Sequence, residues 1–491
     1  MELHFSKSVC QCLRKATCQT VSQEQTQELR LPDAMPDIGR VLGSWGQIVI
    51  RSKEWRGNGM NVTGGVMAWI LYAPEDGSAP QTLDCWIPIQ MKWDFPQTQR
   101  DGTMCILPSL KGVDARTVSA RKLMVRAVVS ILGEALEPME AALYEAPQVP
   151  EDISLLKRTY PMVLPLEAGE KPVQMEEQLI FPSSMPPMER ILHYGMTPMV
   201  TEQKVLANRL VFRGNGCIRM VYMTPDGQIA GWNWELPFSQ YTELDRDYGP
   251  NVTPWTMPIV TALEIERDGD GKWMLKAGIA VQYVIQDRIM AELVQDAYSP
   301  SRKVTVQTEN LRLPMELDNC KHDLQVRPDW ENPGQRILDA VWYYDHPRHH
   351  REGDNLDIEV TGQFQVLYQD EEGQLQGTVV RTEDHIPMAI SPDTHMDAYM
   401  NCQSCGGDLT AEAMICCSVT GEQGLPMITG LEIGEMVQPD PHRPSLILRR
   451  ANGEDLWTIA KSCGSTVEAI EKANGLEQAP LPNQMLLIPI S

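Results

Sequence analysis

The sequence contains no long apolar run and little positive charge. No stretch approaches the ~18 continuous apolar residues that a membrane-spanning helix needs. Residues 1–40 also lack the apolar core of a secretory signal peptide, so we expect the chain to stay in the cytoplasm of the cell that makes it. With 42 Lys and Arg against 66 Asp and Glu, the net charge is −24. This charge disfavours nucleic acids and anionic membranes as direct partners, and it suits a basic surface on another protein.

The sequence also lacks the short motifs of common active sites. It has no Gly-x-x-x-x-Gly-Lys-Ser/Thr phosphate loop and no Gly-x-Ser-x-Gly nucleophile turn. Asp268-Gly269-Asp270-Gly271 begins like a calcium loop, but the later ligands do not follow, so we expect a hairpin turn. His346, His349 and His350 lie in the charged stretch 345–354, for which we expect a solvated loop. We therefore predict a protein that is not an enzyme and uses no cofactor.

The cysteines do not form a regular framework. The twelve cysteines are irregularly spaced, which indicates free thiols in a reducing compartment. Cys402 and Cys405 together with Cys416 and Cys417 could hold zinc, because two thiolate pairs suit its tetrahedral coordination. However, Cys416 and Cys417 are neighbours in an expected strand, where adjacent side chains face opposite sides. We predict no metal site, with zinc at these four cysteines as the alternative.

An internal repeat dominates the sequence. Eight residues recur 150 positions later: Pro32, Met35, Pro36, Arg40, Leu42, Gly64, Tyr72 and Gly77 become Pro182, Met185, Pro186, Arg190, Leu192, Gly214, Tyr222 and Gly227. Four of them recur again 146 positions further on, as Arg336, Leu338, Tyr368 and Gly373. We therefore predict repeats at 10–150, 151–300 and 301–437, a proline-rich linker at 438–444, and a tail domain at 445–491.

Each repeat has the patterns of β-strands and hairpins. In the first, residues 67–72 run into Pro74-Glu75-Asp76-Gly77, a turn in which proline presets one dihedral and glycine supplies a positive φ. Segments such as 123–131 alternate or are continuously apolar, as half-buried or buried strands are. The predicted fold class is mainly β, with three repeated sandwich- or barrel-like domains. The prolines of 438–444 predict a semi-rigid spacer that holds the tail away from the repeats.

The tail has a different pattern. Short apolar runs at 446–448 and 485–488 predict two strands. Between them, one apolar stripe of a helix is formed by Leu456, Ile459, Ala460 and Cys463. Asp455 can cap the start of this helix and Gly464 its end.

A second helix is expected after Gly464. Ser465 and Glu468 have the spacing of a capping box, and Asn474-Gly475 provides an end. The predicted order of elements in the tail is therefore β-α-α-β.

The tail resembles a LysM domain. The resemblance is carried by Gly453, Leu456-Trp457-Thr458-Ile459-Ala460, Gly464, Val467, Ile470, Asn474 and the closing segment 481–489. LysM domains usually bind N-acetylglucosamine polymers through the loops before the first helix and after the second. The resemblance places these binding loops at Gly453, Glu454, Asp455 and Leu456, and at Asn474, Gly475 and Leu476.

The first of these loops departs from the family pattern. The usual Gly-Asp-Thr or Gly-Asp-Ser is Gly453-Glu454-Asp455 in this chain, so a carboxylate replaces a hydroxyl. Two adjacent carboxylates fit a neutral sugar less well than a basic protein surface. Alternatively, Asp455 is only a helix cap.

The repeats resemble SPOCS domains, which are found in sporulation-associated proteins of endospore-forming Clostridia. The resemblance is carried by Pro36-Asp37-Ile38-Gly39-Arg40-Val41-Leu42, the strand ending in Leu71-Tyr72, the Asp76-Gly77 turn and Ile87-Pro88. SPOCS-like units followed by a LysM domain are the domain order of SipL-type spore coat proteins. Those proteins bind the spore coat morphogenetic ATPase that covers the forespore.

This resemblance implies a non-enzymatic protein of spore coat assembly and encasement. It would act in the mother-cell cytoplasm at the forespore surface, with the morphogenetic ATPase and other coat proteins as partners. The alternative is a protein that binds peptidoglycan or a chitin-like glycan of the spore cortex or cell wall. A wall hydrolase with a LysM targeting arm is a third reading, which requires an active site that the sequence does not reveal.

Overall fold

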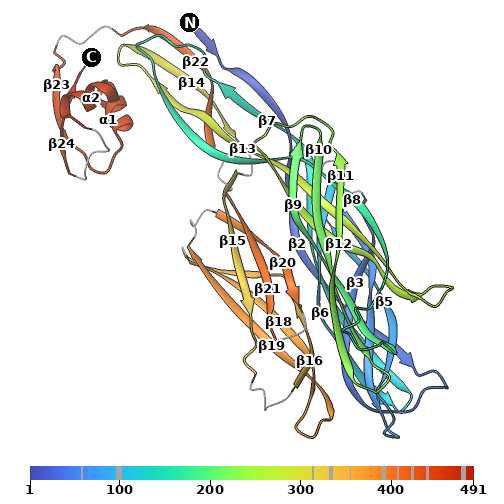
Figure 1. The fold of residues 1–491 in the computed structure, drawn as a ribbon. Helices are drawn as coiled ribbons and strands as arrows, with labels where there is room; N and C mark the ends of the chain where they lie inside the picture. Colours follow the sequence, from blue (N-terminus) through green and yellow to red (C-terminus); the bar gives the residue numbers. More distant parts are fainter. Residues whose placement is uncertain are drawn as a thin grey trace.

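A computed structural model of the chain describes residues 1–56, 59–94, 102–311, 315–330, 336–353, 355–389, 394–405, 409–421, 425–437, 442–476 and 483–490. These residues are mostly in antiparallel β-strands, and the helices among them lie in the tail (Figure 1). The predicted fold class, mainly β with a β-α-α-β tail, is therefore confirmed. None of the helices in the described ranges has the length and apolar character to cross a membrane.

The strands form three successive units. The first unit contains β2 (Ser6–Arg30), β3 (Ile38–Arg56), β4 (Gly59–Pro74), β5 (Gln81–Asp94), β6 (Thr103–Ser119) and β7 (Lys122–Glu145). The second contains β8 (Ser154–Gln178), β9 (Arg190–Leu206), β10 (Arg209–Met223), β11 (Ile229–Glu243), β12 (Val252–Arg267) and β13 (Trp273–Tyr298). The third contains β14 (Arg302–Leu311), β15 (Met315–Val326), β16 (Arg336–Tyr344), β17 (Arg348–Glu352), β18 (Asn355–Gln369), β19 (Leu375–Ala389), β20 (Thr394–Cys405), β21 (Ala411–Gly421) and β22 (Leu425–Met436).

The three units share one strand topology. In the first unit, β2-β7-β6 form one sheet and β3-β4-β5 the other. The second unit repeats this as β8-β13-β12 and β9-β10-β11. In the third unit β15-β21-β20 form one sheet, and β16 and β19 both pair with β18 in the other. Each unit is thus a sandwich of two small antiparallel sheets, with its apolar residues facing inward.

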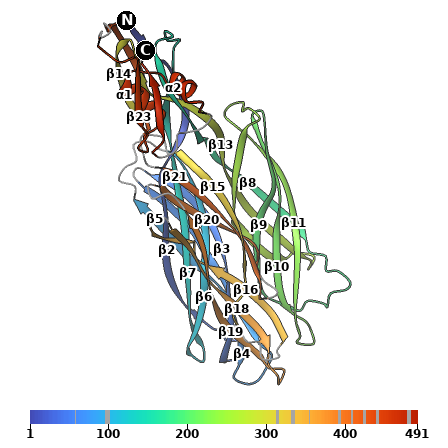
Figure 2. The same ribbon diagram turned by 90° about the vertical axis from the view of Figure 1, so that its left-hand side faces the viewer.

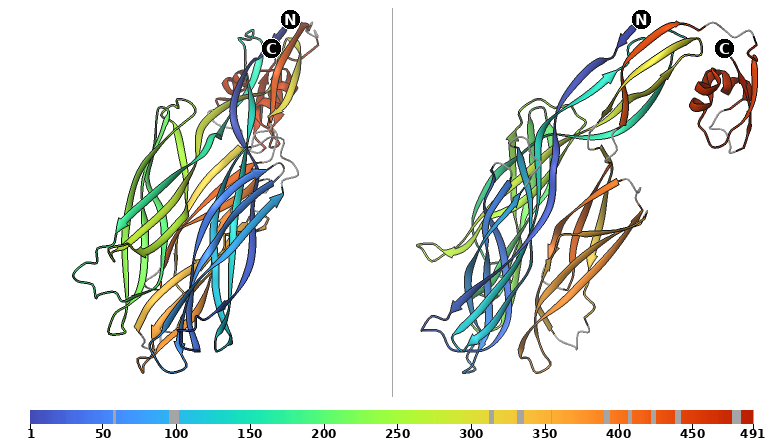
Figure 3. Two further views of the ribbon diagram at one scale, coloured as in Figure 1. Left: turned by 90° about the vertical axis from the view of Figure 1, so that its right-hand side faces the viewer. Right: turned by 180° about the vertical axis from the view of Figure 1, so that it is seen from behind.

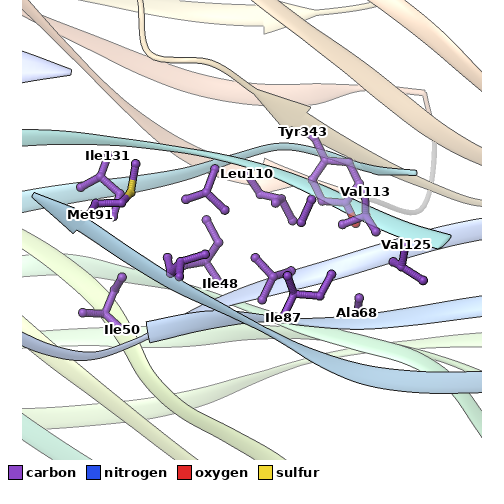
Figure 4. Close-up of a cluster of buried hydrophobic side chains, with 14 of the residues drawn as sticks. Ile48, Ile50, Ala68, Ile87, Met91, Leu110, Val113, Val125, Ile131 and Tyr343 are labelled. Atoms are coloured by element: carbon purple, nitrogen blue, oxygen red, sulfur yellow. The ribbon is translucent and has the colours of Figure 1, made fainter. Parts of the chain in front are cut away.

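The cores of the units are not separate. Figure 4 shows the core of the first unit, where Ile48 of β3, Ile87 of β5 and Val125 of β7 meet. Tyr343 of β16, in the third unit, reaches into the same cluster and is only 6% exposed. Its hydroxyl accepts a hydrogen bond from the backbone N–H of Gly46, at 2.9 Å. The sandwiches therefore pack as one body, and Figure 2 shows them side by side.

Repeated residues make equivalent contacts within the units. The hydroxyl of Tyr72 donates to the carbonyl of Pro36 at 3.0 Å, and that of Tyr222 donates to the carbonyl of Pro186 at 2.9 Å. The turns after these strands contain Gly77, Gly227 and Gly373, with φ of 74°, 79° and 79°. A positive φ favours glycine, which explains why it recurs at this position.

The repeated arginines join one unit to the next. Arg40 of the first unit donates to the side chain of Gln376 and to the carbonyl of Leu375 in the third unit. Arg190, the equivalent residue of the second unit, donates to Gln81 and to the carbonyl of Pro80 in the first unit. The same side chain thus makes the same kind of contact across two different junctions.

The repeated leucines meet where all three units join. Leu42 and Leu192 are buried there, 3% and 0% exposed, and Leu338 packs against them. The next layer of this junction also comes from one repeated position: Leu71, Val221 and Leu367. The recurring motif therefore holds the repeats together where the three units meet.

The position after each leucine differs between the units. It is Gly43 in the first, His193 in the second and Asp339 in the third. His193 and Asp339 are bonded at 2.8 Å between a ring nitrogen and a carboxylate oxygen, and Arg219 forms an ion pair with the same carboxylate. Gly43 leaves room for the indole of Trp45, which stacks on His193 with ring centroids 4.4 Å apart.

Beyond the sandwiches, the first and last strands of the units continue and pack together. Cys12, Met162 and Leu311, from the first, second and third units, share one buried cluster there. β1 (Glu2–His4) pairs with β22, so the N-terminus joins the end of the third unit. β2 begins at Ser6, ahead of the predicted start of the first repeat at residue 10. Figures 1 and 3 show this bundle of ribbons beside the tail.

Candidate binding site in the C-terminal domain

The tail consists of a two-stranded ribbon and two short helices. β23 (Leu446–Arg450) pairs with β24 (Met485–Pro489), and α1 (Leu456–Cys463) and α2 (Val467–Asn474) lie between them in sequence. Ile459, Ile470 and Leu486 are fully buried in a small core of the domain. The apolar spacing of both helices directs these residues to one side.

The caps of the first helix follow the sequence prediction. The carboxylate of Asp455 accepts a hydrogen bond from the N–H of Thr458 at 2.8 Å, and this bond lowers the pKa of Asp455. Gly464 ends the helix in the left-handed conformation, at φ 65°. For the second helix the prediction was wrong by one residue. Thr466, not Ser465, is the N-cap, while Ser465 is buried and donates to the carbonyl of Pro489.

The residues of the first predicted binding loop make contacts inside the protein. Gly453 adopts φ 88°, which turns the chain from β23 toward α1. Both carboxylate oxygens of Glu454 accept hydrogen bonds from Arg449, at 2.8 and 2.7 Å. Asp455 caps α1, which was the alternative to a role in binding, and Leu456 packs at the edge of the core. A direct role for these four residues in ligand binding stays a prediction.

The first residue of the second predicted loop, Asn474, also makes hydrogen bonds inside the tail. The side chain of Asn474 donates to the carbonyls of Ile470 and Leu487 at 2.8 and 2.7 Å. Its carbonyl oxygen accepts from the N–H of Leu487, at 2.7 Å. Gly475 ends α2 at φ 61°, and Leu476 packs on the core. Asn474 thus ties α2 to β24, and the structure describes this loop only as far as Leu476.

The tail is docked on the second unit. The indole N–H of Trp457 donates to Asp296 at 2.9 Å, and Lys461 donates to both oxygens of that carboxylate at 2.7 and 2.8 Å. Tyr298 packs into the core of the tail, and its hydroxyl donates to the carbonyl of Ser465 at 3.0 Å. Burial opposes ionisation of Asp296, but Lys461 and Trp457 lower its pKa below the ordinary value.

These contacts correct one sequence prediction. A proline-rich spacer was expected to hold the tail away from the repeats, but α1 rests directly on the end of β13. Residues 438–441 of that segment lie outside the described residues. The sequence did carry a signal for this junction, because Trp457 is a large aromatic residue off the apolar stripe of α1.

The proposed zinc ligands are only partly described. The side chains of Cys402 and Cys405 lie outside the described part of the structure. Cys417 is buried inside the third unit, whereas its neighbour Cys416 packs in a different cluster, against the first and second units. The two side chains therefore point to opposite faces of β21. Among the described residues, no group of His, Cys, Asp and Glu could hold a metal ion.

The other motifs are structural. Asp268–Gly271 is the hairpin turn between β12 and β13, with the Asp268 carboxylate accepting from the N–H groups of Asp270 and Lys272. The solvated loop expected for the three histidines was wrong, because His349 and His350 are exposed but lie in strand β17, and His346 is buried. His346 is 3% exposed, accepts from the N–H of Leu132 at 3.3 Å, and burial lowers its pKa to about 4.

A cavity of about 730 Å³ lies between the three units. It is lined by residues of all of them, among them Trp45, Trp234 and Tyr344. Two of the side chains that line it, His193 and Arg219, are paired with the buried carboxylate of Asp339. Burial opposes ionisation of Asp339, but His193 and Arg219 lower its pKa. The buried charges at this cavity therefore serve the junction between units.

Comparison with known proteins identifies the tail alone. No curated protein matches the chain, and no solved structure does. Residues 451–489, which hold both helices and the closing strand, match the LysM domain family.

Proposed function

We propose that this chain is a non-enzymatic assembly protein of the spore coat, which docks through its LysM domain on the coat morphogenetic ATPase at the forespore surface. The order of three SPOCS-like repeats and a LysM domain supports the spore coat role. The repeats would form a rigid scaffold in the mother-cell cytoplasm, and the tail would attach it to its partner.

The observation that favours a protein partner over a sugar is that side chains of the two predicted binding loops make hydrogen bonds inside the tail. Glu454 is paired with Arg449, and Asp455 and Asn474 hold helix α1 and strand β24 in place. Side chains that are already engaged inside the protein have fewer lone pairs and less freedom left for the hydroxyls of a sugar. A protein partner can instead use the surface of the domain outside these loops.

The test is deletion of residues 446–491 in a sporulating host, followed by electron microscopy of the coat. We expect coat material that no longer encases the forespore. The result counts only if the three units stay folded, and thermal unfolding of the purified truncated chain checks this. Normal encasement by folded units without the tail would overturn the proposal.

Glycan binding is the second candidate, and the match of residues 451–489 to the LysM family favours it. Its test is sedimentation of the full chain with peptidoglycan, and titration with chitin oligomers. Micromolar binding that is lost in Leu476→Asp, while this variant keeps the thermal stability of the wild type, would support a glycan ligand. Asn474 is unsuitable for this test because it holds β24 to α2.

A further inference from the structure

One face of the LysM ribbon is apolar and uncovered. Leu446, Leu448, Met485 and Leu487 are 47%, 65%, 46% and 36% exposed. Leu448 is the cross-strand partner of Leu487, with the pairs Leu446–Pro489 and Arg450–Met485 on either side. Since strand neighbours two apart share a face, these six residues form one surface, which we call the outer ribbon face.

The outer ribbon face points away from the rest of the protein. The opposite side of the ribbon is covered by α1 and α2, and α1 is the element that contacts β13. Figures 1 and 3 show β23 and β24 on the far side of the tail from the ribbons of the three units. The docked tail therefore presents this face to solvent.

The edge of β23 is open, whereas that of β24 is closed. The side chain of Asn474 bonds both backbone groups of Leu487 on β24. On β23, the carbonyl of Ser445 and the N–H of Ala451 face the partner strand. Because bonding alternates along an antiparallel strand, the backbone groups of Leu446, Leu448 and Arg450 face outward, and among the described residues β23 pairs with β24 alone.

The charge beside the face indicates the chemistry of its occupant. Arg449 is paired with Glu454 and Lys461 with Asp296, but no described acidic side chain pairs with the exposed Arg450. A six-residue face is also far smaller than the about 20–30 residues a side of a stable interface between globular proteins. An added strand gains main-chain hydrogen bonds as well as apolar contact, so it suits so small a surface better than a second copy does.

We propose that the open edge of β23 and the outer ribbon face take up an extended segment of the partner protein. That segment has apolar side chains at alternate positions and a carboxylate that meets Arg450. This inference rests on the proposed function and names the surface that performs it.

The experiment uses the full-length chain and the purified coat morphogenetic ATPase, with binding measured by biolayer interferometry. Leu448→Asp is expected to weaken binding at least tenfold, and Arg450→Glu severalfold. The matched control is Leu206→Asp, the same change at a leucine on the second unit that is 51% exposed. Since Leu448 is mostly exposed, its variant should keep the thermal stability of the wild type.

The outcomes separate the surface from the function. Slower amide hydrogen exchange at 446–450 in the wild-type complex is expected, and unchanged exchange would overturn strand addition. Equal binding by the Leu448 and Leu206 variants would overturn the surface while leaving the function intact. A wild-type chain that does not bind the ATPase would overturn both. Conversion of a dimer to a monomer by Leu448→Asp would assign the face to a second copy, against the inference.

Discussion

Two junctions in this protein are built in different ways. Where the three units meet, Leu42, Leu192 and Trp45 are nearly inaccessible, and Asp339 is fully buried. Where the tail meets the second unit, Tyr298 is buried, but the side chain of Asp296 is 26% exposed and that of Lys461 46%. The first junction is part of a core, whereas the second is a docking contact with a polar, partly exposed rim.

The difference bears on which parts can move independently. Apolar burial and desolvated charges make the units interdependent, because separating them exposes both at once. An ion pair that water can reach contributes little, typically about 0–1 kcal/mol. We therefore expect the three units to unfold together and the tail to detach or unfold locally at lower free energy.

The strongest way to break the unit junction is Asp339→Asn. It leaves Arg219 without its buried counter-charge, and breaking a buried ion pair in this way costs about 3–5 kcal/mol. Urea unfolding measures the free energy, and the exposed Asp247→Asn is the control, with no expected change. A loss below about 1 kcal/mol would show that the buried network does not hold the units together.

The pH dependence of stability tests a second contact between units, in which the buried His346 of the third unit accepts a hydrogen bond from Leu132 of the first. Its pKa of about 4 in the folded protein lies below the ordinary value near 6.5, so the unfolded chain binds its proton first as pH falls. The contribution is complete above pH 6.5 and is lost between about pH 6.5 and 4, by about 3 kcal/mol. His346→Gln should remove this part of the pH profile. Identical slopes for both proteins would contradict the assignment.

Arg190→Ala tests the repeated arginine contact. Its guanidinium donates to the side chain of Gln81 and to the carbonyl of Pro80, and hydrogen bonds to charged groups contribute about 1.5–3 kcal/mol. We expect a loss near 1.5 kcal/mol in urea unfolding, and a similar loss for Arg190→Lys, because an ammonium cannot replace the planar fork. The exposed Arg213→Ala serves as the control. Full stability of the lysine variant would mean that only the charge matters.

Asp296→Asn should have the smallest effect on global stability, under about 1 kcal/mol, because its ion pair is partly solvated. Its effect should be local, with faster amide hydrogen exchange in α1 and no change in the sandwiches. Glu292→Gln, on the same strand but paired with Lys157, is the control. Global destabilisation as large as that of Asp339→Asn would remove the distinction between the two junctions.

Some of this architecture was predictable because it depends on local pattern. Alternating apolar residues predicted the strands, and the Asp76-Gly77 turn predicted the hairpin of β4 and β5, since only nearby residues decide them. His346 was missed because the charged residues around it in sequence say nothing about the neighbouring unit that covers it. The capping shift from Ser465 to Thr466 was missed because Ser465 is held by Pro489, a contact distant in sequence.

Local patterns were enough to predict a β-rich chain with three repeats and a LysM tail, because turns, helix caps and the residues within each repeated motif are defined by short stretches of chain. The role of the repeated motif is seen only in the packing of the three units. Arg40, Leu42 and their counterparts at 190 and 192 contact residues of other units, and no spacing along the chain encodes such partners. The packing of the units also brings His193 against Asp339 and against Trp45, for which Gly43 leaves room, because these contacts join residues of different units.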